Sequence, residues 1–153
     1  MSSDSLEDLK RSVCDAVDEI EETLLTVSHA VHANPELSFQ EHEACRLLVS
    51  TLEAAGLPVE PGAYGLQTAF ATDFGQGDSE SACVALLAEY DALPEIGHAC
   101  GHNIIATASV GAGLALRALG DRLPGRIRIL GTPAEERGGG KELMARQGAF
   151  EGI

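Results

Sequence analysis

The sequence predicts an α/β fold in which a partly parallel mixed sheet is flanked by helices. Three observations support this prediction: an apolar stripe of helical period near the start, short apolar runs of strand length, and an Ala- and Gly-rich helical segment between two of those runs. Strands and helices that alternate along a chain commonly form parallel pairs with helical crossovers. The 153 residues are enough for one domain with a hydrophobic core.

The first part of the chain is predicted to be helical. Apolar residues recur every three or four positions over 5–32, which predicts one long helix with Ser5 as its cap. An Asn-Pro pair then ends this helix, because the residue before proline is pushed out of helical geometry. Ser38 and Glu41 have the spacing of a capping box, which predicts the start of a second helix that ends at Gly56.

The remainder of the chain alternates between predicted strands and helices. Apolar and polar residues alternate over 66–72, which predicts a strand with one exposed face. A polar loop at 75–81 precedes a continuous apolar run at 83–88, which predicts a strand buried on both faces. A buried helix whose small residues allow close packing, a short strand and a last helix are then predicted over 104–119, 126–130 and 141–147.

Charge and cysteine usage limit the class of partner and the compartment. The net charge of −14 disfavours binding to nucleic acid or to anionic membranes. No run of apolar residues is long enough to span a bilayer, and the polar start does not resemble a signal peptide. We therefore expect a cytoplasmic protein with reduced thiols, in which the cysteines at 14, 45 and 83 are small buried or half-buried apolar residues.

A thiol and an imidazole lie two residues apart in the stretch HACGHN at 98–103. Gly101 separates Cys100 from His102 and allows a tight turn, so both side chains can point at one spot. A thiolate and an imidazole together suit Zn²⁺ or a neighbouring transition metal. Two adjacent carboxylates, Glu135 and Glu136, follow a predicted strand and could divide metal binding and proton transfer between them.

The residues that carry this chemistry follow the carboxyl ends of predicted strands. In α/β sheets, ligands gather at these ends. The residues concerned are Asp91, Cys100, His102, Glu135 and Glu136. Their convergence at one edge of the sheet is the physical argument for a site.

A metal-dependent hydrolase is the interpretation that uses all these groups. A metal would hold Cys100 as thiolate and His102 as neutral imidazole, and it needs at least one carboxylate more, for which Glu136 is suited. Glu135, beside it, could take a proton from water and pass it to a leaving nitrogen. The products would be those of amide hydrolysis.

Two other interpretations stay open from the residues alone. Cys100 could act as a nucleophile with His102 or His98 as its base, although this leaves the paired glutamates without a role. The chain could also be a structural module without catalytic activity. Three further histidines have no accompanying thiol or paired carboxylate, so we expect surface or packing roles for them: His29, His32 and His42.

Four motifs in order resemble the M20 family of metallopeptidases, in particular its amidohydrolase branch. They are HANPELS at 32–38, EYDALP at 89–94, HACGHN at 98–103, and PAEE with the following GGGK at 133–141. The branch contains aminoacylase-like enzymes, aminobenzoyl-glutamate hydrolases and a dipeptidase-like subgroup. Glu89, Asp91 and the closing Asn103 are most similar to the last two of these.

The resemblance implies a site and a reaction. It implies that Glu135 is the general base and that a divalent metal is the cofactor, Zn or Mn first and Co or Ni as further options. The metal ligands that it implies are Cys100, His102 and Glu136. Asp91 and His98 would contact these ligands without binding the metal themselves. The implied substrates are N-acyl amino acids or dipeptides, and the implied assembly of the full-length form is a homodimer.

The resemblance also bears on domain organisation. Members of the family are much longer than this chain, with further metal-binding histidines and an inserted lid and dimerisation domain. The resemblance therefore implies that 1–153 is a partial catalytic domain, with the lid domain and the C-terminal part of the catalytic domain outside it. We expect exposed apolar edges on the sheet and no activity from this part alone, and a non-catalytic remnant or assembly module of the family is the alternative.

Overall fold

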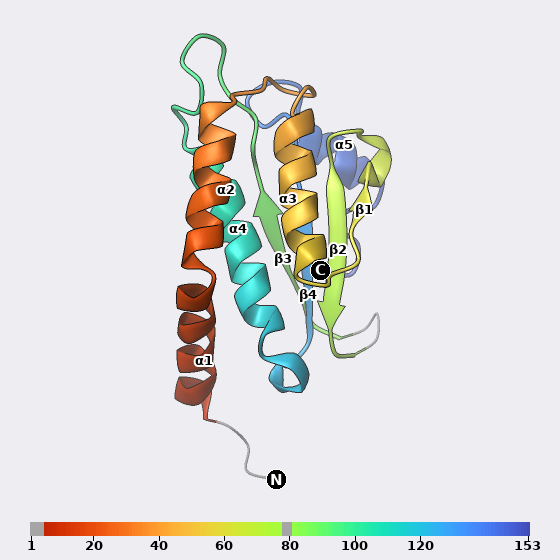
Figure 1. The fold of residues 1–153 in the computed structure, drawn as a ribbon. Coiled ribbons are helices and arrows are strands. Elements are labelled where there is room, and N and C mark those ends of the chain that lie inside the picture. Colours follow the sequence, from red (N-terminus) through yellow and green to blue (C-terminus); the bar gives the residue numbers. More distant parts are fainter. Residues whose placement is uncertain (1–4, 78–80) are drawn as a thin grey trace.

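A computed structural model describes residues 5–77 and 81–153, so part of the predicted polar loop at 75–81 lies outside the described residues. Helices and strands alternate along the chain (Figure 1). The helices are α1 (Leu6–Glu19), α2 (Glu21–Ala33), α3 (His42–Ala54), α4 (His102–Arg117) and α5 (Gly140–Arg146), with short 3₁₀ turns η1 (Ala63–Gly65) and η2 (Gly120–Arg122). The strands are β1 (Glu60–Pro61), β2 (Phe70–Gly75), β3 (Cys83–Ala88) and β4 (Arg126–Gly131).

The strands form one mixed sheet, which confirms the predicted fold class. Their order is β1-β2-β4-β3, with β3 and β4 parallel and the other pairs antiparallel. Helix α4 connects β3 to β4 and packs on one face of the sheet (Figure 1). Ala88 pairs with Gly131, so the carboxyl ends of β3 and β4 lie side by side. The segments that follow these two strands therefore start from the same edge.

Apolar side chains fill both faces of the sheet. Ile127 and Ile129 of β4 belong to the larger core cluster, which includes residues of α2, α3 and α4, whereas Leu130 belongs to a smaller cluster with Met144 of α5. A Cβ added to Gly113 would lie 2.3 Å from Ile129 Cδ1, so only glycine lets α4 approach the sheet this closely. The prediction that small residues in this helix allow close packing is confirmed.

The prediction of one helix over 5–32 is wrong, because the chain forms two helices that meet at Ile20. Ile20 has φ −105° and ψ 7°, and its N–H bonds to Val17 O rather than to the carbonyl four residues back. The apolar stripe continues across this single non-helical residue, so periodicity does not reveal it. The cap at Ser5 is confirmed, since its Oγ accepts a hydrogen bond from Asp8 N at 3.2 Å.

The predicted capping box of the next helix is also wrong. Helix α3 begins at His42, and Glu41 occupies the N-cap position, but its side chain makes no capping hydrogen bond. The carboxylate of Glu36 caps the helix instead, by accepting hydrogen bonds from Glu43 N at 3.1 Å and Ala44 N at 2.9 Å. The end at Gly56 is confirmed by its left-handed φ of +79°.

Strand predictions are confirmed in position for β3 and β4 but not for β2. The strand predicted at 66–72 begins only at Phe70, because Ala69 N bonds to Leu66 O at 2.9 Å in a turn. The prediction that β3 is buried on both faces is wrong, since Val84 is 56% exposed. Strand β3 is the last strand of the described sheet, so one of its edges has no neighbour among the described residues, as expected for an exposed apolar edge.

Burial of the cysteines follows the prediction in part. Cys45 is buried and Cys83 is half-buried, as predicted, but Cys14 is exposed on α1. Helix α1 contributes no buried residue, which explains why an apolar position on it stays in contact with solvent. Among residues 5–77 and 81–153, no helix combines the length and the apolar character that crossing a membrane requires.

Candidate metal centre

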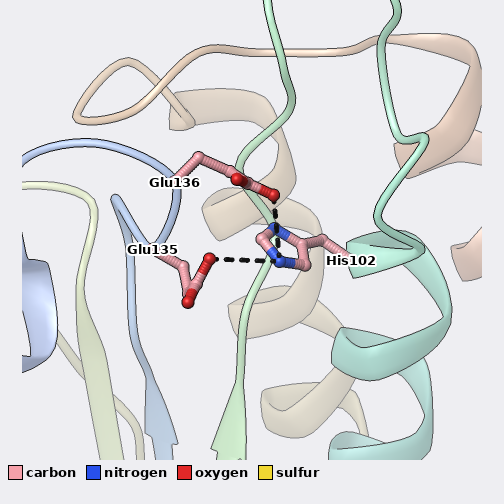
Figure 2. Close-up of side chains that lie close together, drawn as sticks. All are labelled: His102, Glu135 and Glu136. Atoms are coloured by element: carbon pink, nitrogen blue, oxygen red, sulfur yellow. Dashed lines mark ion pairs between the residues drawn. The ribbon is translucent and has the colours of Figure 1, made fainter.

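One histidine and two glutamates meet at the edge where β3 and β4 end. His102 is the first residue of α4, and Gly101 before it has a left-handed φ of +80°, which turns the chain into the helix. Glu135 and Glu136 follow β4, and Figure 2 shows both carboxylates directed at the His102 ring. One nitrogen or oxygen atom from each of the three residues lies within 4.8 Å of the other two. The structure thus brings together His102, Glu135 and Glu136 as the sequence predicts.

The spacing of these atoms fits a shared cation better than direct hydrogen bonds. His102 Nε2 lies 3.7 Å from Glu136 Oε1 and 3.8 Å from Glu135 Oε2, beyond normal hydrogen-bond length. Two atoms bound to one zinc ion at ~2.1 Å in tetrahedral geometry are roughly 3.4 Å apart. Facing carboxylates repel one another unless a cation lies between them, so the residues fit a divalent metal.

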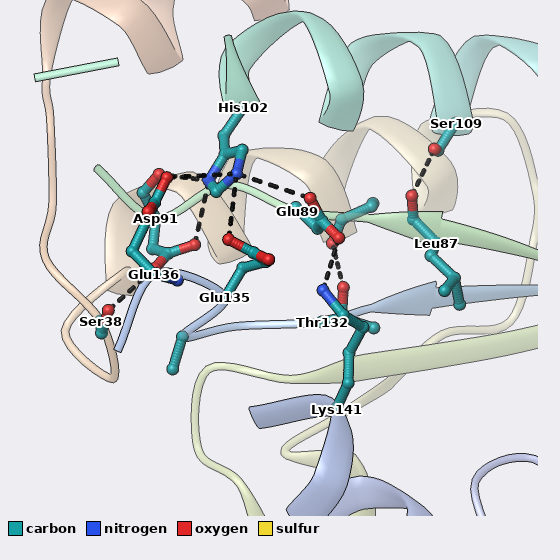
Figure 3. A network of polar contacts seen from close by, with 12 residues as sticks. Ser38, Leu87, Glu89, Asp91, His102, Ser109, Thr132, Glu135, Glu136 and Lys141 are labelled. Atoms are coloured by element: carbon teal, nitrogen blue, oxygen red, sulfur yellow. Dashed lines mark hydrogen bonds and ion pairs between the residues drawn. The ribbon is translucent and has the colours of Figure 1, made fainter. Parts of the chain in front are cut away.

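The other ring nitrogen of His102 is held by Asp91. Nδ1 lies 2.7 Å from the Asp91 backbone oxygen and 3.1 Å from its Oδ1 (Figure 3). Both neighbours are acceptors, so Nδ1 carries the proton and donates it. The lone pair is then on Nε2, which faces the glutamates and is free to bind a metal.

Asp91 also joins three separate segments of the chain. Its side chain is buried, with Asp91 1% exposed, and Oδ2 accepts hydrogen bonds from Ser38 Oγ at 2.8 Å and from Glu136 N at 3.0 Å. Ser38 belongs to the loop between α2 and α3, and Glu136 to the segment after β4. Asp91 therefore orients His102 and fixes the backbone of Glu136, while its role as a support for metal ligands stays a prediction.

Cys100 is exposed and lies beside Glu136 rather than inside the three-residue cluster. A hydrogen bond to the Glu136 carboxylate, together with slight desolvation and the nearby negative charges, raises the pKa of the Cys100 thiol. A nucleophilic cysteine needs a lowered pKa, so this surrounding disfavours the thiol-enzyme hypothesis. The role of Cys100 as a metal ligand stays a prediction.

His98 is buried next to another histidine. Its ring centroid lies 6.3 Å from that of His32, and burial lowers the pKa of His98. His102 also contributes to lowering the pKa of His98, but neither ring nitrogen of His98 has a hydrogen-bond partner among the described residues. The supporting role of His98 stays a prediction. His29 and His42 are exposed, as predicted for residues without a part in the site.

A fourth carboxylate near His102 was missed by sequence reasoning. Glu89 directly follows β3, and its Oε2 lies 3.5 Å from His102 Nε2. Its other oxygen forms an ion pair with Lys141 of α5 (Figure 3). The position of Glu89 at the carboxyl end of a strand, two residues before Asp91, is a signal that could have identified it.

The fold and this site define an α/β domain with a candidate metal centre, and comparison with known proteins identifies the family. Residues 85–153 match the model of peptidase family M20/M25/M40, and these residues contain His102, Glu135 and Glu136. The chain belongs to the M20 family of peptidases.

Relatives extend the match over nearly the whole chain. It is 43% identical to the Xaa-Arg dipeptidase of Mus musculus, over 99% of this chain and 38% of the mouse protein. It is 39% identical to the Xaa-Arg dipeptidase of Homo sapiens, over 97% of this chain and 37% of the human protein. The chain thus spans little more than a third of the length of these two relatives.

Solved structures show the same fold. A dinuclear metal-binding peptidase of the M20 family from Bacillus subtilis superposes with a TM-score of 0.78 at 25% identity, over 89% of this chain and 41% of that chain. A structure from methicillin-resistant Staphylococcus aureus superposes with a TM-score of 0.80 at 24% identity, over 94% of this chain and 40% of that chain.

Proposed function

We propose that this chain forms the metal-binding part of an amidohydrolase or peptidase that cleaves the amide bond of N-acyl amino acids or dipeptides. The observation that carries the proposal is the meeting of His102, Glu135 and Glu136 from two segments that follow adjacent parallel strands. Buried Asp91 holds His102 with Nε2 directed at both carboxylates, so the arrangement is built by the fold.

The proposed ligands are Cys100, His102 and Glu136. A bound divalent metal supplies Lewis-acid polarisation of the substrate carbonyl and lowers the pKa of water toward ~7. His102 offers its Nε2 lone pair because its Nδ1–H donates a hydrogen bond to the Asp91 backbone oxygen. Glu136 offers a carboxylate whose backbone is fixed by its hydrogen bond to Asp91, and Cys100 must lose its proton to bind.

Glu135 is proposed as the general base. Its side chain is 38% exposed, compared with 18% for Glu136, so water and substrate reach Glu135 more easily. Its carboxylate accepts the proton of the attacking water and then donates it to the leaving nitrogen. The amide bond breaks to a carboxylate and an amine, and Glu135 returns to its starting state.

The names of the relatives support the substrate class. Besides the Xaa-Arg dipeptidases, the chain is 31% identical to a p-aminobenzoyl-glutamate hydrolase polypeptide of Escherichia coli, over 97% of this chain. It is also 34% identical to an N-acetyl-L-cysteine deacetylase of Bacillus subtilis, over 88% of this chain. Each of these names describes hydrolysis of an amide bond to an amino acid. We extend this shared chemistry to the protein that contains this chain.

The metal, the assembly and the compartment are further parts of the proposal. Thiolate, imidazole and carboxylate ligands together favour Zn, with Mn as the second choice and Co or Ni after it. A homodimer is proposed for the full-length form, and the cytoplasm as compartment is supported by four cysteines that are all unpaired.

The test is hydrolysis by the native gene product isolated from its source cells, with a panel of dipeptides and N-acyl amino acids. We expect turnover that a chelator abolishes and that added Zn²⁺ or Mn²⁺ restores. Glu135→Gln should reduce kcat at least ~100-fold, since general base catalysis contributes ~10²–10⁴-fold. Glu142→Gln, at an exposed residue seven positions on, is the matched control. Turnover that survives both the chelator and Glu135→Gln would overturn the proposal.

A further inference from the structure

Glu41 is a second buried carboxylate and lies outside the three-residue cluster. It contacts the turn that comes directly before Glu135 and Glu136. Glu41 precedes α3 and is 0% exposed. Its Oε1 accepts a hydrogen bond from Ala134 N at 2.9 Å, across 93 positions of sequence. Burial of a carboxylate costs free energy unless hydrogen bonds compensate for the lost water. An apolar side chain would fill the same space at lower cost. Besides Ala134 N, the carboxylate meets the Thr68 hydroxyl and backbone groups of its own loop, and Ala134 is the partner that lies next to the three-residue cluster.

The turn at Ala134 has an unusual backbone conformation. Ala134 has a φ of +58°, in the left-handed region that residues with a Cβ rarely adopt. Such conformations persist only where the surroundings impose them, and they concentrate at functional sites. Here Glu41 bonds the N–H of Ala134, and Gly140 N bonds its carbonyl oxygen at 3.2 Å. The peptide groups on both sides of the strained residue are thus held.

The left-handed residue explains how two consecutive glutamates face the same nitrogen. In extended backbone, neighbouring side chains point to opposite sides. After Ala134 the chain turns, and Glu135 and Glu136 lie at nearly equal distances, 3.8 Å and 3.7 Å, from His102 Nε2. Figure 3 shows both carboxylates on the same side of the ring. Relaxation of Ala134 toward ordinary backbone geometry would separate them.

We propose that Glu41 is a positioning residue that holds Ala134 in its left-handed conformation, so that the Glu135 and Glu136 carboxylates converge on the metal site. This inference rests on the proposed metal centre and adds a residue to it. Two hydrogen bonds enclose Glu135: Glu41 to the N–H before it and Asp91 to the N–H after it. The loop between α2 and α3 contributes to both, through Glu41 directly and through Ser38 on Asp91.

Two substitutions at Glu41 separate this role from a role of its charge. Glu41→Gln removes the charge but keeps an oxygen that reaches Ala134 N. Glu41→Asp keeps the charge but withdraws the oxygen by one methylene. If Glu41 acts by position, Glu41→Asp weakens Co²⁺ binding about tenfold or more and changes the visible Co²⁺ spectrum, whereas Glu41→Gln stays within about threefold of wild type. A role of charge alone gives the reverse order, and would overturn the proposal.

Controls remove the remaining explanations. Glu53→Gln changes an exposed glutamate of α3 and should leave Co²⁺ binding unchanged. Far-UV circular dichroism and unfolding curves identify conditions in which every variant is folded, and affinities are compared there. Hydrogen exchange at the Ala134 amide is a readout without metal, and it should be faster in Glu41→Asp than in Glu41→Gln.

The outcomes distinguish this inference from the proposed function. If the wild-type chain binds Co²⁺ and Glu41→Asp binds it equally well, the positioning role is overturned while the metal centre stands. If the wild-type chain binds no Co²⁺, the metal centre is overturned and the positioning role with it. Weak binding by Glu41→Asp, near-wild-type binding by Glu41→Gln and unchanged binding by Glu53→Gln support the proposal.

Discussion

Replacing Asp91 with Asn is predicted to weaken the binding of a metal by His102. Oδ2 of Asp91 accepts hydrogen bonds from Ser38 Oγ and Glu136 N, and Oδ1 lies 3.1 Å from His102 Nδ1. Asn keeps only one side-chain oxygen. When this oxygen accepts from the two donors at Oδ2, the amide NH₂ group replaces Oδ1 and faces the Nδ1–H donor. The backbone oxygen at 2.7 Å still accepts the Nδ1 proton, but the ring loses the negative charge beside it, so the Nε2 lone pair becomes a weaker metal ligand.

The structure sets the size of the effect. Asp91 is 1% exposed, so water does not replace the lost acceptor. A hydrogen bond to a charged group contributes ~1.5–3 kcal/mol. Substitution of such supporting partners usually weakens metal binding about 10- to 100-fold, which corresponds to ~1.4–2.7 kcal/mol. We therefore expect Asp91→Asn to weaken binding of Zn²⁺ or Co²⁺ about 10- to 100-fold.

The assay is a titration with Co²⁺, followed by its visible spectrum, on wild type and Asp91→Asn. Asp73→Asn is the matched control, because Asp73 is a partly exposed aspartate of β2 that pairs with Arg128 away from the site. The control should bind Co²⁺ as wild type does. If a folded Asp91→Asn chain binds within threefold of wild type, the Asp91 carboxylate does not support metal binding by His102.

Three further predictions concern the surrounding residues. Gly140→Ala would place a Cβ 1.8 Å from the Pro133 carbonyl oxygen, and we expect a loss of about 3 kcal/mol in the free energy of unfolding by urea. Alkylation of Cys100 should slow about tenfold when Zn²⁺ is added, while alkylation of exposed Cys14 stays unchanged, as measured by peptide mass spectrometry. Burial raises the pKa of the Glu41 carboxyl above 4.5, so the folded chain binds the carboxyl proton more tightly than the unfolded chain does. The stability that this difference contributes is lost as pH rises from 4.5 through the raised pKa. Glu41→Gln lacks this titration, so its unfolding free energy relative to wild type should increase over that pH window, as followed by urea unfolding.

Each of these predictions has an outcome that opposes it. An unchanged urea midpoint for Gly140→Ala would mean that the turn tolerates a side chain there. Equal slowing of both cysteines by Zn²⁺ would indicate general precipitation or chelation of the reagent rather than binding at Cys100. A constant difference between Glu41→Gln and wild type across the pH window would show that Glu41 does not titrate with a raised pKa.

Much of the site could be predicted because its residues follow strand ends. Runs at 83–88 and 126–130 are rich in apolar residues, and this identifies β3 and β4 by residue type alone. Once two strands are parallel neighbours, the segments after them must meet. His102, Glu135 and Glu136 lie in these segments, so their convergence follows from topology.

The roles of the supporting residues could not be predicted, because their local sequence pattern predicts a helix cap instead. Ser38 and Glu41 have the spacing of a capping box, but their side chains bond to Asp91 and Ala134, which are far away in sequence. The cap of α3 comes from Glu36, at a position that no capping motif includes. Long-range hydrogen bonds replaced a local pattern here, and sequence spacing contains no information on such bonds.

Errors in element boundaries and in burial have other origins. Ile20 interrupts the first predicted helix without breaking its apolar stripe, and the turn before Phe70 contains apolar residues that resemble strand alternation. Val84 is exposed because β3 is the last strand of the described sheet, a property of the assembled sheet rather than of the run itself. The exposure of Val84 thus depends on tertiary structure, whereas the breaks at Ile20 and before Phe70 are local turns that the apolar pattern does not reveal.

The most direct test of the metal centre is X-ray absorption at the zinc edge of the Zn²⁺-loaded chain. We predict one sulfur at about 2.3 Å, from Cys100, together with nitrogen and oxygen at about 2.0–2.2 Å, from His102 and Glu136. The sulfur signal should disappear in Cys100→Ser and persist in Cys14→Ser. A shell of oxygen alone, or a sulfur signal that depends on Cys14 instead, would contradict the assignment of these three residues as ligands.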